Sequence, residues 1–133
     1  MDIVEEHLIK WRRSSFKWGK SDCMLAIADY LEGRFNIDCA SHYRGKYNSR
    51  ASCRELTNYN GNIIRVFESG VAKIGLATTD NPVRGDVGII EVEECGKQIE
   101  IAALCLGDGF WGIRALRGVI ITKTVKLIKG WSV

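Results

Sequence analysis

The sequence has few histidines and no long apolar run, and each absence excludes a class of protein. Only His7 and His42 occur, and no second ligand pair completes the Cys39-x-x-His42 spacing. A structural zinc site needs four ligands, so we expect no metal and no other cofactor. No apolar run approaches the roughly 18 residues of a transmembrane helix, so no membrane span is expected. The acidic N-terminus, Met1–Glu6, is unlike a signal peptide.

A disulfide framework is also missing. The five cysteines (Cys23, Cys39, Cys53, Cys95 and Cys105) make an odd count without tight spacing. We therefore expect free thiols and a reducing compartment. With 133 residues, the chain is long enough to bury a core without cross-links.

Acidic residues are absent from the C-terminal quarter. After Asp108 there is none, whereas five basic residues follow, namely Arg114, Arg117, Lys123, Lys126 and Lys129. Two interpretations stay open: an acidic or phosphate-rich partner, or a solvated strand edge protected by lysines. The net charge of +3 is mild, and no groove pattern of stacking aromatic and basic residues is evident, so a nucleic-acid partner is not favoured.

The stretch from Phe16 to Gly33 organises the chain. An aromatic and glycine-containing loop leads into an almost wholly apolar run, Cys23–Leu31, interrupted by Asp29. Ser21 or Asp22 is suited to cap this helix at its N-terminus, and Gly33 is suited to end it. We therefore predict a helix buried on most of its sides.

Cys23 lies on the first turn of that predicted helix. The positive end of the helix dipole favours a thiolate, and such placement can lower a cysteine pKa from about 8.5 to roughly 3.5–7.5. The alternative is an inert cysteine that fills space in the core. Trp18 and Gly19 favour a reactive site, because they place an aromatic wall and a residue of close backbone approach at the helix start.

Three further helices are expected at residues 2–14, near 49–59 with Ser49 as the cap, and near 62–70. Between them, residues 34–47 form an irregular segment that includes Tyr43, Arg44 and Tyr47. This segment is either the rim of a cleft or an ordinary loop whose tyrosines cover the core, and the sequence favours neither.

The second half of the chain has strand periodicity. Strands are predicted at 87–92, 98–106, 110–115, 119–122 and 125–128, with turns at 94–97 and 107–109. Helices followed by an antiparallel meander indicate an α+β fold, with residues 1–133 forming a single domain.

Three motifs in this order resemble the NlpC/P60 group of papain-like cysteine peptidases: Asp22-Cys23, Gly85-Asp86-Val87, and Leu106-Gly107-Asp108-Gly109. A narrower resemblance is to a family of small phage and prophage proteins related to that group, and it rests on Trp18-Gly19 with Asp22-Cys23, Tyr43-Arg44-Gly45-Lys46-Tyr47, Arg84-Gly85-Asp86 and Gly130-Trp131-Ser132-Val133. The resemblance implies a papain-like fold, with N-terminal helices packed on a C-terminal antiparallel sheet.

The resemblance also implies residue roles. Cys23 matches the nucleophile, with Asp22 beside it, and the backbone N–H groups of residues 22–24 are the expected oxyanion donors. Trp18, Gly19, Tyr43, Arg44 and Tyr47 are the expected binding residues. The histidine base of the group corresponds to about Ile101, between Glu100 and Ala102, so the base is missing and His42 is the candidate replacement.

Two functions follow from this resemblance. One is a phage-borne thiol hydrolase that cleaves peptidoglycan stem peptides during cell entry. The other is a papain-like domain without catalytic activity, which binds other phage tail proteins at the tail tip. Either way, the expected location is the host cytoplasm during synthesis and the virion tail afterwards.

Overall fold

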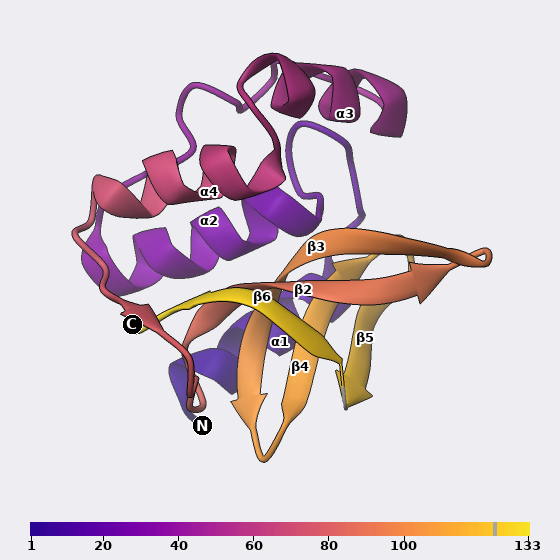
Figure 1. Cartoon of the computed structure of the whole chain (residues 1–133). Coiled ribbons are helices and arrows are strands. Elements are labelled where there is room, and N and C mark those ends of the chain that lie inside the picture. Colours follow the sequence, from indigo (N-terminus) through magenta and orange to yellow (C-terminus); the bar gives the residue numbers. More distant parts are fainter. Residues whose placement is uncertain (124) are drawn as a thin grey trace.

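Within residues 1–123 and 125–133, the computed structural model of the protein has four helices and one six-stranded antiparallel sheet. The helices are α1 (Ile3–Arg13), α2 (Cys23–Phe35), α3 (Arg50–Tyr59) and α4 (Ile63–Ala72). The strands are β1 (Thr78–Thr79), β2 (Val87–Glu94), β3 (Lys97–Gly107), β4 (Phe110–Ala115), β5 (Gly118–Lys123) and β6 (Lys126–Trp131). The predicted α+β class is confirmed (Figure 1).

The helix N-termini follow the local capping signals. Asp2 caps α1, and Asp22 rather than Ser21 caps α2. Ser49 and Ser52 form a reciprocal capping box at the start of α3, and Asn62 caps α4. Each side-chain oxygen accepts a backbone N–H that has no partner inside its helix.

The predicted end of α2 is wrong. The helix continues through Gly33 to Phe35 and ends at Asn36, whose φ of 57° is left-handed. Gly33 serves packing instead, because a Cβ there would lie 3.1 Å from Nε2 of His7 on α1. The glycine lets these two helices approach closely.

The strand order is β1-β6-β2-β3-β4-β5. Strands β2 to β5 form the predicted meander, but β6 returns across the sheet and pairs with β2 instead of β5. The two-residue strand β1, which the sequence did not predict, pairs with β6. As a result β2 is central, and its Ile89 and Ile90 are fully buried on opposite faces.

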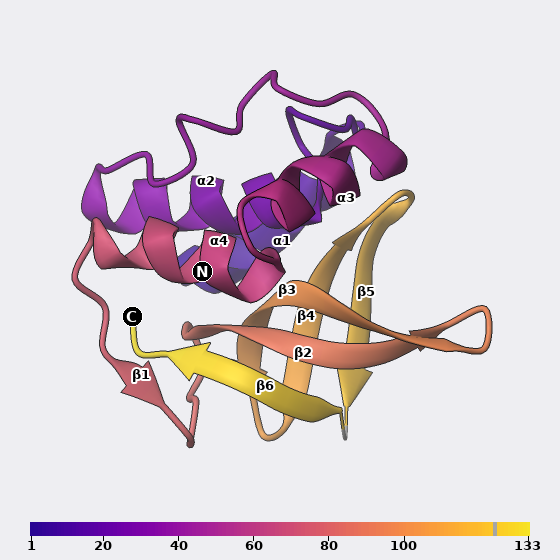
Figure 2. The same cartoon turned by 45° about the horizontal axis from the view of Figure 1, so that its top comes forward.

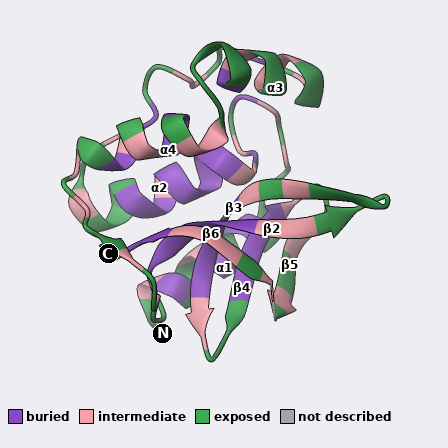
Figure 3. Ribbon diagram, in the orientation of Figure 1, coloured by how far each residue is buried: buried purple, intermediate pink, exposed green. Residues whose placement is uncertain are grey.

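Two apolar clusters cover the two faces of the sheet. On the helical side, α2 packs through residues such as Leu25 and Ile27 against Val87, Ile89 and Leu104. On the other face, a smaller cluster comprises Ile90, Ala103, Cys105, Trp111 and Ile113. The β4–β5 pair runs across the long β2–β3 hairpin (Figure 2), and α2 is the most buried helix (Figure 3).

Candidate functional site

A groove of about 1250 Å³ lies between α3 and the sheet. Its walls come from the start of α2, one side of α3, the outer halves of β2 and β3, and the β4–β5 hairpin. Cys23 lines it beside Phe16 and Trp18. Small-molecule pockets are typically about 300–1000 Å³, so the space is sufficient for a larger, extended ligand.

Cys23 is the first residue of α2, and its surroundings disfavour the thiolate. Burial, the Asp22 carboxylate and the neighbouring Cys53, in that order, raise the pKa of Cys23 to about 12. Hydrogen bonds from the backbone N–H groups of Met24 and Cys23 act in the opposite direction and are outweighed. The expectation of a lowered pKa is therefore wrong, because desolvation exceeds the effect of the helix terminus.

Asp22 is fully buried, and its carboxylate holds the start of α2 in place. Oδ1 accepts the N–H groups of Met24 and Leu25, both at 3.1 Å. Oδ2 accepts the N–H of Gly19 at 2.8 Å and the hydroxyl of Tyr47 at 2.7 Å. Both oxygens are engaged in the fold, and the Met24 N–H, one of the expected oxyanion donors, already bonds to Asp22.

Gly19 and Tyr47 join two loops around this carboxylate. Gly19 has a φ of +81°, and a Cβ there would lie 2.1 Å from the carbonyl oxygen of Tyr47. Its own carbonyl accepts the N–H of Gly45 at 2.8 Å. Only glycine fits this contact, so the structure places both predicted binding residues in the support of Asp22.

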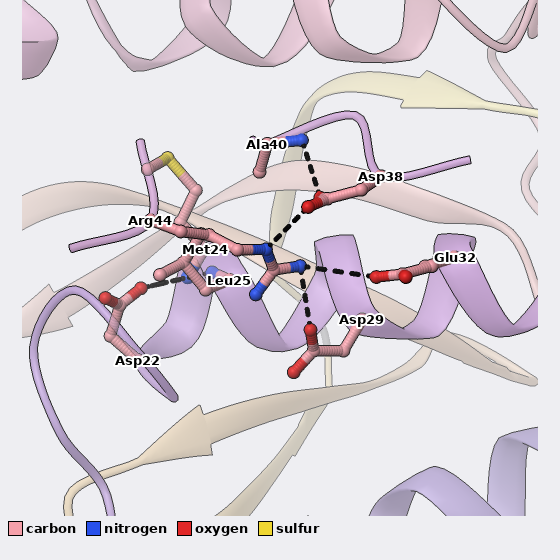
Figure 4. Close-up of polar contacts among 8 residues, drawn as sticks. All are labelled: Asp22, Met24, Leu25, Asp29, Glu32, Asp38, Ala40 and Arg44. Carbon is pink, nitrogen blue, oxygen red and sulfur yellow. Dashed lines mark hydrogen bonds and ion pairs between the residues drawn. The ribbon is translucent and has the colours of Figure 1, made fainter. Parts of the chain in front are cut away.

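Arg44 lies in a cluster of carboxylates (Figure 4). Its guanidinium is 2.8 Å from Asp29, 3.0 Å from Asp38 and 3.7 Å from Glu32. Asp38 also accepts the N–H of Ala40 at 3.1 Å. The guanidinium beside Asp38 lowers the pKa of that carboxyl. Arg44 thus ties the loop after α2 back onto the helix.

The other predicted residues are dispersed. Trp18 packs edge-to-face on Phe16 with ring centroids 5.0 Å apart, and both line the groove. Tyr43 lines a separate small apolar cavity between α2 and α4. His42 is exposed, and in the described part of the chain it neither lines the groove nor bonds to Cys23. The structure does not bring the proposed Cys23–His42 pair together.

The described residues of the sheet include no histidine. Ile101 lines the same groove as Cys23, as does Glu100. Glu100 lies directly opposite Glu91 in the β2–β3 pairing, and Lys126 of β6 lies opposite Glu91 on its other side, so this wall carries charges of both signs. A carboxylate near a thiol raises its pKa and opposes thiolate formation.

Sequence reasoning missed two residues near the groove. Cys53 on α3 also lines it, and helical periodicity gave no signal for this. Arg114 is only 2% exposed, although the sequence placed it among the basic surface residues. It donates to the carbonyl oxygens of Trp11, Ser14, Ser21 and Gly118. A solvated position is therefore the wrong interpretation for Arg114.

Residues 1–123 and 125–133 contain no group of three or more His, Cys, Asp or Glu side chains placed to hold a metal ion. No helix within them combines the length and apolar character that crossing a bilayer requires. All five cysteines are free thiols.

Comparison with known proteins gives one match. A family model described as a domain of unknown function, DUF6950, matches residues 2–133. No curated protein and no solved structure matches the chain. Because the match leaves out only the first residue, the chain belongs to the DUF6950 family.

Proposed function

We propose that the domain is an NlpC/P60-like binding module without catalytic activity, whose groove holds an extended polypeptide segment. The observation that carries this proposal is the chemistry around Cys23. The thiol lines the groove, but its pKa is raised to about 12, and Ile101 occupies the position at which the resemblance expects a base. An isoleucine can neither accept a proton nor return one to a leaving amine.

The shape and lining of the groove support a polypeptide ligand. Apolar side chains such as Trp18, Ile99 and Ile113 lie beside charged ones of both signs, including Arg54 and Glu93. This mixture suits a peptide, which presents apolar side chains, charged side chains and backbone polar groups together. An ion pair between Arg50 and Glu94 joins α3 to the β2–β3 hairpin across the groove.

The second candidate is the thiol hydrolase acting on peptidoglycan stem peptides. It is favoured by one observation, namely that Cys23 stands at the N-terminus of α2 and lines the groove. It requires a proton acceptor that reaches Cys23 only when substrate is bound, because His42 does not contact the thiol in this structure.

Hydrolysis of purified peptidoglycan, measured as release of dye-labelled fragments, separates the two functions. Wild-type protein is compared with Cys23→Ala and with Cys53→Ala, a matched change of the neighbouring thiol. We expect all three to release fragments only at the background rate. Release by the wild type and Cys53→Ala, but not by Cys23→Ala, would overturn the binding proposal and establish the hydrolase.

The proposed place of the module is a phage tail tip, which rests on the resemblance to phage and prophage proteins. It is tested by co-sedimentation of the protein with purified phage particles. We expect the wild type and Cys23→Ala to co-sediment. Asn58→Trp places a ring in the groove from α3 and should abolish this, whereas Glu55→Trp, on the same helix outside the groove, should not. A wild type that never co-sediments contradicts the tail-tip role.

A further inference from the structure

Strand β5 is an open edge of the sheet. Among the described residues it pairs with β4 alone, whereas the opposite edge is the two-residue strand β1. Figure 2 shows β5 at the side of the sheet away from β1. It is six residues long and contains no proline and no bulge in its pairing with β4. Proline and a bulge, two of the devices that prevent strand addition, are therefore missing from β5, and the charged residues Arg117 and Lys123 are the device that remains.

The hairpin geometry identifies which backbone groups face outward. The β4–β5 loop consists of Leu116 and Arg117, so Ala115 and Gly118 flank a two-residue turn and form a hydrogen-bonded pair. Bonded and non-bonded pairs then alternate along the ladder. The N–H and C=O groups of Val119, Ile121 and Lys123 accordingly point away from β4, towards the free edge.

Exposed apolar side chains gather on this hairpin. In the described part of the chain, half of the exposed large hydrophobic residues belong to it: Phe110, Leu116, Ile120 and Ile121. Leu116 is 71% exposed, Ile120 54% and Ile121 49%. A group of this kind beside free backbone donors and acceptors is typical of a protein-binding surface.

The charge around the edge is positive. Arg117 and Lys123 stand at its two ends, and Arg12 of α1 lies next to Gly118. Within residues 1–123 and 125–133, none of these three cations forms an ion pair with a carboxylate; Lys123 instead lies over the Phe110 ring, 4.6 Å from its centroid. No acidic residue follows Asp108.

The same charges oppose a second copy of this chain as the occupant. In an antiparallel pairing of two β5 strands centred on Ile120, Arg117 of each copy would stand opposite Lys123 of the other. Like charges directly opposite each other destabilise a strand pair. The carboxylates of an acidic segment would instead be attracted by Arg117 and Lys123 at these two positions.

We propose that the free edge of β5 binds an extended acidic polypeptide as an added strand, with apolar residues along its centre and carboxylates near its ends. This goes beyond the proposed function, because it concerns the outward backbone groups of β5. Leu116, Arg117 and Ile120 also line the groove, whereas Ile121 and Lys123 do not. Main-chain hydrogen bonds from Ile121 and Lys123 supply the pairing, and Arg117 and Lys123 select the charge.

The test is fluorescence polarisation with a labelled peptide that has the core Val-Thr-Ile-Thr-Val between pairs of glutamates. The control peptide carries lysines in place of the glutamates. We expect the acidic peptide to bind and the basic one to bind at least about tenfold more weakly. Equal binding of both peptides, or no binding of the acidic peptide, would overturn the proposal.

Two kinds of variant locate the binding. Ile121→Pro removes an outward N–H and should weaken binding about tenfold or more, and Lys123→Glu, a charge reversal outside the groove, should also weaken it. Lys73→Glu, a charge reversal away from the hairpin, should change it less than about twofold. If Asn58→Trp in the groove abolishes binding while the β5 variants do not, the edge proposal fails and the groove proposal gains support.

Amide hydrogen exchange tests the proposal on the wild-type protein, so the result does not depend on whether a variant folds. Addition of the acidic peptide should slow exchange at Ile121 and Lys123, whose N–H groups face outward. Unchanged exchange at both amides would contradict strand addition. Self-association of the free protein that slows exchange at the same two amides would overturn the proposal in favour of a second copy.

Discussion

The two ends of the groove are constructed in opposite ways. At the Cys23 end, the Asp22 carboxylate is 0% exposed and bonds to N–H groups and the Tyr47 hydroxyl. At the β4–β5 end, isoleucine side chains are about half exposed and the outward backbone groups of β5 have no strand partner among the described residues. At the Cys23 end the polar groups of Asp22 are hydrogen-bonded within the fold. At the β4–β5 end the outward N–H and C=O groups of β5 remain available to a ligand.

This contrast changes how the residues of the sequence motifs near Cys23 are interpreted. The sequence resemblance predicts site roles for Asp22, Gly19, Tyr47 and Arg44, and in this fold each of them has a structural role. The fold requires them whether or not Cys23 is reactive. Their presence therefore does not distinguish an enzyme from a binding module, and the reactivity of the thiol does.

The largest expected effect is on that reactivity. Between pH 7 and 8, iodoacetamide should label Cys23 at least about tenfold more slowly than an ordinary exposed thiol with a pKa near 8.5, because a pKa of about 12 leaves very little thiolate and the greater nucleophilicity of that thiolate compensates only in part. Peptide mapping measures this, with the exposed Cys95 in the β2–β3 turn as internal reference. Saturation of Cys23 labelling below pH 8 would contradict it.

The same pKa sets a pH dependence of stability. The thiol has a pKa of 9.0 as its ordinary value and about 12 in the fold, so the unfolded chain loses this proton first as the pH rises. The contribution of Cys23 to stability is therefore complete below about pH 9 and decreases between pH 9 and 12. Urea unfolding of the wild type and Cys23→Ala should converge over this range.

Asp22→Ala should cause the largest loss of stability. It leaves the Tyr47 hydroxyl and the Gly19 N–H buried without their partner and removes the cap of α2, so we expect a decrease of about 3–5 kcal/mol in the free energy of unfolding. Ser49→Ala at the cap of α3 is the matched control and should cost about 1 kcal/mol. Equal costs in urea unfolding would show that Asp22 is only a cap.

Arg114→Met should cost about 2–4 kcal/mol, because the buried guanidinium satisfies carbonyl oxygens of Trp11 and Ser14 at the end of α1. Arg117→Met in the exposed turn is the control and should change stability by no more than about 0.5 kcal/mol. Thermal unfolding measures both. Similar values would contradict the role of Arg114 in fixing α1 to the sheet.

These residues also show what the sequence can and cannot predict. Ser49 is predictable as a cap, and Asp22 as one of two candidates with Ser21, because capping is a local signal within four residues. The burial of Arg114 and the pKa of Cys23 depend on contacts with distant segments. Arg114 binds carbonyl groups about a hundred residues away, and only tertiary structure determines how far the thiol is desolvated.

The same distinction applies to the fold. The meander from β2 to β5 is predictable because tight turns join successive strands. The pairing of β6 with β2 is not, because no local sequence signal specifies which strand β6 pairs with. Gly33 carried the signal of a helix end, but its contact with His7 determined its role. For the candidate site, the cysteine and its cap were predictable, and the groove and its open edge were not.

Tyr47→Phe should have an intermediate effect, a loss of about 1–2 kcal/mol. It removes one hydroxyl that donates to Asp22 at 2.7 Å but keeps the ring in the core. Tyr43→Phe, whose ring borders the small apolar cavity, is the matched control and should be nearly neutral. A neutral Tyr47→Phe in urea unfolding would show that the Asp22 carboxylate does not depend on this donor.

The smallest effect is expected at the open end. Ile121→Thr should change stability by no more than about 0.5 kcal/mol, because the side chain is 49% exposed and threonine keeps the β-branch that suits a strand. Ile113→Thr on the adjacent β4 is the matched change in the second core, where the side chain is 5% exposed, and should cost about 2–3 kcal/mol. If Ile121→Thr cost as much, the hairpin surface would be part of the core and not available to a partner. A near-neutral result, combined with loss of binding to the acidic peptide, would mean that Ile121 serves the interface and not the fold.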